Sequence, residues 1–138
     1  MYKCYEYVGG KVVQPPDLYL GATVPIYGYG FIIHDADDYT LRHMEDHCKL
    51  WTYSALPAVL NKLSRCKELL VRTILCLPGL SSIFVDLNTC FAIFKKAGLT
   101  LVKQEIMTMM RVLDPRRIGS VKLTKILKFI MTNNESTR

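Results

Sequence analysis

Residues 17–46 read DLYLGATVPIYGYGFIIHDADDYTLRHMED and set the architecture of the first part of the chain. Residues 19–26 and 31–34 are rich in β-forming side chains, and two glycines fall in the short segment between them. Glycine supplies the positive φ that a tight reversal needs. The pattern therefore predicts an antiparallel hairpin that turns at residues 27–30.

An acidic corner follows the hairpin, with three aspartates in residues 35–38. Carboxylates at this point cap a helix and favour its positive N-terminal end. Tyr39, Leu41 and Met44 would then share one face of the helix that follows. The same carboxylates would also suit acid–base chemistry, but capping explains them more simply because no substrate cleft is indicated.

The remainder of the sequence has the periodicity of helices. Apolar residues recur at steps of three and four from Leu56 to Leu77, which predicts one helix that ends at Pro78-Gly79. Three more helices are predicted, over residues 86–96, 101–112 and 121–131. We therefore expect an α+β fold with a β-rich unit over residues 1–50 and a helical unit over residues 51–138.

The last two predicted helices enclose a segment with the register of a calcium-binding EF-hand loop. Numbered from Asp114, the segment has Gly119 at position 6 and Val121 at position 8, where this loop type needs a glycine and an apolar residue. A weaker loop over residues 78–89 has Val85 at its own position 8. The register predicts an EF-hand-like pair, with a plain helical bundle as the alternative.

The oxygen ligands of such a loop are largely missing. Asp114 keeps position 1, but the other ligating positions hold Arg116 at position 3, Ile118 at 5, Lys122 at 9 and Lys125 at 12. Three cations repel a divalent ion instead of binding it. We therefore predict a degenerate pair that holds no calcium, and a chain without a metal cofactor.

Positive charge is concentrated in the C-terminal third. The net charge is +6, and residues 95–138 hold ten Lys/Arg against three Asp/Glu. Such a surface favours an acidic protein, anionic lipid or nucleic acid as its partner. Phe129 is the sole aromatic residue of this segment, which weighs against single-stranded nucleic acid because base stacking needs aromatic rings.

Compartment and redox state follow from what the sequence lacks. The first residues carry no apolar signal-peptide core, and no apolar run approaches the roughly 18 residues that suggest a membrane span. We therefore expect a cytosolic or cytoskeletal protein. No two cysteines form a CxxC pair, so reduced and mostly buried thiols are expected at Cys4, Cys48, Cys66, Cys76 and Cys90.

Residues with catalytic or metal-binding chemistry are sparse. His43 and His47 lie one helical turn apart with Cys48 beside them, but the HExxH order and a clear third ligand are absent. Residues 9–11 read GGK and lack the remaining framework of a phosphate-binding loop. We predict no catalytic residues and no small-molecule substrate.

The segment from Gly21 to Glu45 resembles the end of the last β module in the EF-hand domain-containing, or myoclonin, family. The family pattern GA.V...G..F.I.DADEYTL.YME is matched at Gly21-Ala22, Val24, Gly28, Phe31, Ile33, Asp35-Ala36-Asp37, Tyr39-Thr40-Leu41 and Met44-Glu45. A helical C-terminal unit follows in the same order. The resemblance implies a partial PH-like module, with about half of its strands absent, followed by a degenerate EF-hand pair.

Members of this family lie inside the doublet microtubules of cilia and flagella. The resemblance implies a non-enzymatic structural protein of the axonemal cytoskeleton, with tubulin and other inner proteins as partners and no nucleic acid or membrane. The candidate contact residues are Tyr27, Tyr29, Arg116, Arg117, Lys122 and Lys125.

A second function remains open for the helical unit. EF-hand pairs can open a methionine-lined groove that captures an amphipathic helix. Met109 and Met110 are the candidate groove residues, and the chain would then be a calcium-independent adaptor for a ciliary partner. The plainer role of these methionines is to fill gaps in the core.

Overall fold

The computed structural model describes residues 6–7 and 11–133, and it has the predicted α+β composition. Cys4 and residues 134–138 lie outside the described part. Three two-stranded antiparallel sheets are formed by β1 (Glu6–Tyr7) with β2 (Lys11–Val12), β3 (Thr23–Ile26) with β4 (Tyr29–Ile32), and β5 (Phe84–Val85) with β6 (Val121–Lys122). The α-helices are α1 (Asp38–Asp46), α2 (Leu56–Arg65), α3 (Lys67–Leu75), α4 (Leu87–Lys96), α5 (Lys103–Leu113) and α6 (Leu123–Asn133). Short 3-10 turns occur at Pro15–Asp17, Thr52–Ser54 and Leu80–Ser82.

The predicted hairpin is β3 and β4, joined by a two-residue turn. Tyr27 and Gly28 form that turn with φ values of 51° and 80°, as a turn with two left-handed residues requires. Gly30 was expected to help in the reversal, but it pairs with Pro25 inside the ladder. Proline has no N–H for a ladder bond, and it is tolerated here because the sheet has only two strands.

Helix α1 begins where the acidic corner predicts. The Asp37 carboxylate accepts a hydrogen bond of 2.7 Å from the Thr40 amide, which satisfies one of the free donors of the first turn. Leu41 and Met44 are buried, as expected, but the Tyr39 side chain is 80% exposed. The prediction that Tyr39 shares the inward face is wrong, because one apolar stripe of a short helix accommodates Leu41 and Met44 without it.

The single helix predicted from Leu56 to Leu77 is two helices. The backbone of Cys66, with φ −116° and ψ 20°, departs from helical geometry and separates α2 from α3. The break lets the two halves meet different partners, because α2 packs mainly on α5 while α3 packs on α6 and α4. The inward residues are nonetheless those that the periodicity predicts: Val59, Leu63, Leu70 and Ile74.

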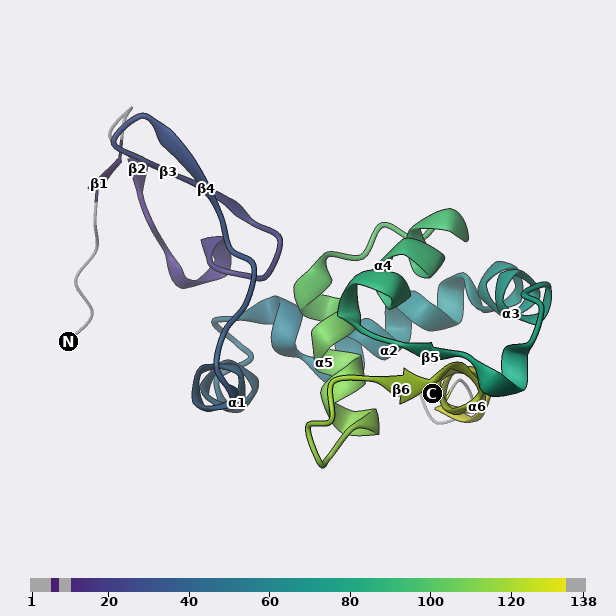
Figure 1. Cartoon of the computed structure of the whole chain (residues 1–138). Helices are drawn as coiled ribbons and strands as arrows, with labels where there is room; N and C mark the ends of the chain where they lie inside the picture. Colours follow the sequence, from purple (N-terminus) through teal and green to yellow (C-terminus); the bar gives the residue numbers. More distant parts are fainter. Residues whose placement is uncertain (1–5, 8–10, 134–138) are drawn as a thin grey trace.

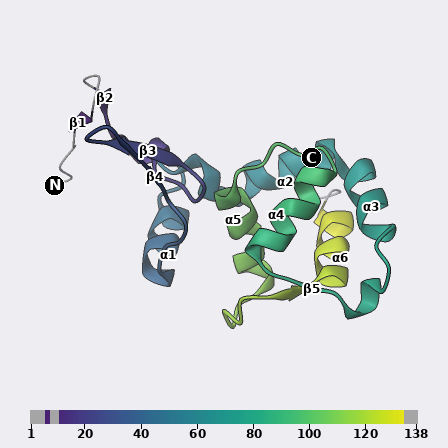
Figure 2. The same cartoon turned by 45° about the horizontal axis from the view of Figure 1, so that its top comes forward.

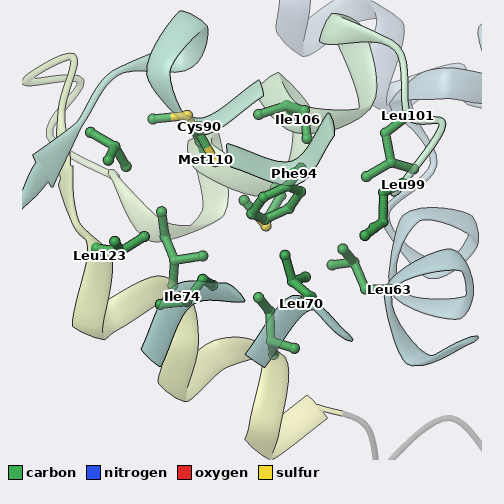
Figure 3. Close-up of a cluster of buried hydrophobic side chains, with 14 of the residues drawn as sticks. Leu63, Leu70, Ile74, Cys90, Phe94, Leu99, Leu101, Ile106, Met110 and Leu123 are labelled. Atoms are coloured by element: carbon green, nitrogen blue, oxygen red, sulfur yellow. The ribbon is translucent and has the colours of Figure 1, made fainter. Parts of the chain in front are cut away.

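One hydrophobic core holds the helical unit together (Figure 3). Phe94 of α4 lies near the middle of the cluster and is 1% exposed. Side chains from α2, α3, α5 and α6 surround it, so each helix buries one apolar stripe against the others. The labelled residues are Leu63, Leu70, Ile74, Cys90, Phe94, Leu99, Leu101, Ile106, Met110 and Leu123.

Two helix–loop–helix units are joined through their loops (Figure 2). The first unit is α3, β5 and α4, and the second is α5, β6 and α6. Val85 of β5 lies opposite Val121 of β6 in the antiparallel ladder. These valines occupy position 8 of the two EF-hand-like loops, numbered from Pro78 and from Asp114, and both are buried. The short ribbon therefore places the loops side by side.

The hairpin unit meets the helical unit through α1 (Figure 1) and through Leu20, which precedes β3. Leu20, Leu41 and Met44 form a second buried cluster, against which Leu87 of α4 and Met107 of α5 pack. The Leu20 amide also donates a buried hydrogen bond of 3.1 Å to Gln104 Oε1. The division at residue 50 stays a prediction, and these contacts cross it.

Two general properties of the described part bear on function. Within residues 6–7 and 11–133, no helix combines the length and apolar character that crossing a bilayer requires.

Of the cysteines in this part, Cys90 is buried, Cys48 and Cys66 are partly buried and Cys76 is exposed. The expectation of mostly buried thiols is therefore confirmed for Cys90, met only in part by Cys48 and Cys66, and wrong for Cys76 at the C-terminal end of α3.

Candidate functional site

Asp114 organises the loop between α5 and α6. It ends α5, and its two carboxylate oxygens accept hydrogen bonds from the amides of Ile118, at 3.0 Å, and Gly119, at 2.8 Å. Partial burial raises the pKa of this carboxyl, but the two amide donors lower it further, so the pKa lies below its usual range. Gly119 reaches its position with a φ of 99°, which only glycine adopts easily.

Cationic side chains satisfy the carbonyl groups at the end of α5. Lys125 Nζ donates to the Leu113 carbonyl oxygen at 2.8 Å. The Arg117 guanidinium donates to the carbonyl oxygens of Arg111 and Asp114 at 2.9 and 2.8 Å. The last carbonyls of a helix lack partners within the helix and carry partial negative charge, so positive groups stabilise them.

Arg117 also belongs to an ionic joint between the loop and α1. Its Nε lies 2.8 Å from Asp38 Oδ1, and Arg111 Nη1 lies 2.7 Å from the same oxygen. Arg111 in addition contacts both oxygens of Glu45, at 2.6 and 3.2 Å. Hydrogen bonds from Arg117 and then from Arg111 lower the pKa of Asp38 from 3.8 to about 2. The joint links the N-cap region of α1 with the end of α5.

The remaining cations of the loop surround a surface cavity of about 320 Å³. Arg116, Lys122 and Lys125 all contribute to its wall, together with Ile118 and Asp114. Arg117 does not, because its guanidinium is turned toward Asp38. The structure thus brings together three of the four basic residues that the sequence singles out and separates the fourth.

The two methionines proposed for an adaptor groove lie in the core. Met109 is 0% exposed and Met110 is 5% exposed. This burial agrees with the plainer role that the sequence indicates, because the two methionines fill space between the packed helices. Their part in a groove stays a prediction. An adaptor that used them would first have to open the pair.

Tyr27 and Tyr29 are on the surface of the hairpin. Their side chains are 83% and 71% exposed, and Phe31 and Ile32 of β4 are more than half exposed as well. The hairpin therefore presents apolar and aromatic area to solvent. Single exposed apolar residues are ordinary on protein surfaces, but four of them on one short hairpin make it a candidate contact element.

The other chemistry-bearing residues take structural positions. The rings of His43 and His47 stack at a centroid distance of 4.2 Å, and that of Trp51 packs edge-on against His43 at 5.3 Å. In the part of the chain that the structure describes, no three His, Cys, Asp or Glu side chains are grouped as metal ligands. A cavity of about 330 Å³ between α1 and α5 is lined by Asp35 and Asp38, and the latter is held by arginines.

Sequence comparison relates the chain to one group of proteins. EF-hand domain-containing family member C2 of Mus musculus is 42% identical over 58 residues, which make up 42% of this chain and 8% of that protein. For the Bos taurus protein of the same name the identity is 30% over 105 residues, 73% of this chain and 14% of the relative. EF-hand domain-containing protein 1 of Mus musculus is 31% identical over 52 residues, 38% of this chain and 8% of that protein. The chain is a homologue of EF-hand domain-containing proteins.

These EF-hand domain-containing homologues are much longer than the region of similarity. The chain spans 8 to 14% of the length of the relatives described above. No protein-family model matches it. The similarity supports an EF-hand-like character for the chain and leaves the activities of the whole relatives as proposals.

Calcium is the ligand that an EF-hand name implies. The second loop, which starts at Asp114 and joins α5 to α6, does not fit this ion. Both oxygens of Asp114 already accept backbone amides, and Lys125 places its ammonium beside the Leu113 carbonyl. Ile118, at the fifth position, has no oxygen ligand in its side chain and is 72% exposed. Calcium needs six to eight oxygens, so these residues cannot form its coordination shell.

Sequence reasoning missed two residues of this region. Arg111 is 7% exposed and makes the ionic joint. Its position among the apolar residues of α5 was the available signal, since a charge on a buried helix face needs a partner. Phe84 of β5 is 59% exposed and has Lys122 Nζ over its ring at 5.7 Å. Nothing in the sequence singles out Phe84 without the pairing of β5 with β6.

Proposed function

We propose that the chain is a non-enzymatic structural protein of ciliary and flagellar doublet microtubules that contacts tubulin and neighbouring inner proteins. The observation that carries the proposal is its homology to EF-hand domain-containing proteins. The resemblance of the sequence Gly21–Glu45 to the ciliary module of that family points to the same setting. On this proposal the chain works in the axonemal cytoskeleton and needs no cofactor.

The surface chemistry supports attachment to an acidic protein lattice. The hairpin offers exposed aromatic side chains at Tyr27 and Tyr29, and the second loop offers the exposed cations Arg116 and Lys122. Aromatic residues and arginine are the types that contribute most to protein interfaces. Attachment through such a surface would be constitutive, because the second loop does not fit the calcium ion that switches other EF-hand proteins.

Extraction of isolated axonemes tests the proposal. A structural protein held by apolar and polar contacts should stay with the doublets when the salt is raised to about 0.3 M, where exposed charge pairs are largely screened. Release of the intact protein in this wash would contradict a structural role and indicate attraction by charge alone.

A further inference from the structure

We propose that the second loop is an anion site, in which the cavity formed by Arg116, Lys122 and Lys125 takes glutamate or aspartate side chains of an acidic polypeptide. The inference rests on the proposed function for the identity of that polypeptide, tubulin, and names the part of the chain that would meet it. The site occupies the place where other EF-hand loops hold a cation.

The charge balance of the cavity is strongly positive. Among the described residues Arg116 forms no hydrogen bond or ion pair, and Lys122 contacts only the ring of Phe84. Lys125 uses one of its three N–H donors on the Leu113 carbonyl oxygen. Asp114 is the one carboxylate in the wall, and both of its oxygens already accept backbone amides.

The geometry of the loop explains why these cations converge. Positions 3, 9 and 12 of an EF-hand loop point toward a common centre, because their side chains normally coordinate one ion. Here those positions are Arg116, Lys122 and Lys125, and all three line the same cavity of about 320 Å³. The fold keeps the convergence while the sequence reverses the sign of the charge, so the ligand that fits is an anion.

The flanks of the cavity favour a polypeptide over a free anion. Ile118, in the wall, is 72% exposed, and Phe84, next to Lys122, is 59% exposed. These apolar side chains add contact area for a peptide that carries both acidic and apolar residues, whereas inorganic phosphate gains nothing from them. Lys122 Nζ lies over the Phe84 ring at 5.7 Å and takes up part of the face on which a nucleic-acid base would stack.

Fluorescence anisotropy with a labelled peptide of alternating glutamate and leucine residues tests the site on the full chain, because such a peptide carries the acidic and apolar groups that the cavity and its flanks offer to bind. The wild-type protein should bind the peptide, and the double variant Arg116→Glu with Lys122→Glu should weaken binding by about tenfold or more. The matched control is Lys95→Glu with Lys96→Glu, which makes the same charge change on exposed residues at the other end of α4. It should weaken binding by less than about threefold, an effect of net charge alone.

Three results would overturn the site. They are absence of peptide binding by the wild-type protein, equal losses in the two double variants, and tighter binding of inorganic phosphate or phosphatidylserine vesicles than of the peptide. Unfolding curves of both variants show whether either has lost its fold, and Arg116→Gln with Lys122→Gln then replaces a misfolded variant. Wild-type protein that resists salt extraction from axonemes but does not bind the peptide would end this inference and leave the proposed function standing.

Discussion

At the scale of single residues, Lys125 occupies the place where an EF-hand loop normally has its bidentate glutamate. Its ammonium donates to the Leu113 carbonyl oxygen, so it brings positive charge to the end of α5. Arg117 does the same for the Arg111 and Asp114 carbonyls. The positive side chains of Lys125 and Arg117 thus stabilise the end of α5 without a bound metal ion.

Calcium should therefore not bind. Isothermal titration of the protein with calcium should show no heat beyond dilution, because the ligating positions offer cations and an isoleucine in place of oxygens. The thermal unfolding midpoint should likewise be unchanged by calcium, since a ligand that binds the native state would raise it. A site of micromolar affinity would show that this reading of the loop is wrong.

The cysteines should differ sharply in reactivity. Burial raises the pKa of the Cys90 thiol to about 12, whereas Cys76 is exposed. Because the thiolate is the reactive form, iodoacetamide at about pH 8 should alkylate Cys76 and leave Cys90 unmodified. Mass spectrometry of native and denatured samples checks this, and rapid labelling of native Cys90 would contradict the packing of α4.

At the scale of elements, periodicity predicts which faces are buried better than where helices stop. Val59, Leu63, Leu70 and Ile74 are all inward, yet the helix that should carry them is interrupted at Cys66. The interruption has no local signal such as proline or glycine, because it arises from the different partners of α2 and α3. Long-range packing of this kind cannot be predicted from residue spacing alone.

The candidate site shows the same division between local and long-range information. The register of Asp114, Gly119 and Val121 is local, and it identifies both the loop and its unsuitability for calcium. The burial of Met109 and the ion pair of Arg117 with Asp38 depend on neighbours far along the chain, so the sequence alone left them open. The unsuitability of the loop for calcium was predictable from the sequence. That Arg117 would pair with Asp38 while the other cations line a cavity was not.

At the scale of the whole molecule, the joint between α1 and α5 unites the two units. The Arg111 side chain is 6% exposed and pairs with Asp38 and Glu45, which both belong to α1. Apolar contacts of Leu41 and Met44 support the same interface. The joint therefore ties α1, which follows the hairpin, to the helix that precedes the second loop.

Replacing Arg111 should loosen this joint. Arg111→Ala should lower the free energy of unfolding by about 2 kcal/mol, less than the loss for a fully buried ion pair because water can reach both carboxylates. Chemical denaturation measures the change. The control Arg72→Ala alters an exposed arginine of α3 and should cost less than about 0.5 kcal/mol. Equal losses for the two substitutions would show that the ion pairs of Arg111 do not stabilise the fold.

The joint also predicts a response to acid. The pKa of Asp38 falls from 3.8 to about 2 in the folded protein, so its carboxylate stabilises the fold above the unfolded pKa. That contribution is lost as the pH drops through the interval between those two values. The wild-type protein should therefore lose more stability than Asp38→Asn across this interval, measured as unfolding midpoints. Parallel acid profiles for the two proteins would show that Asp38 makes no such contribution.

The central claim, a structural role inside the doublet, is tested most directly by electron cryo-microscopy of doublets from cells that express the chain. Density on the inner wall should fit the hairpin and the six helices of the described residues, with Tyr27 and the second loop toward neighbouring proteins. That density should disappear from doublets of cells that lack the chain. Identical maps from the two kinds of cell, with the protein recovered outside the doublets, would contradict the account.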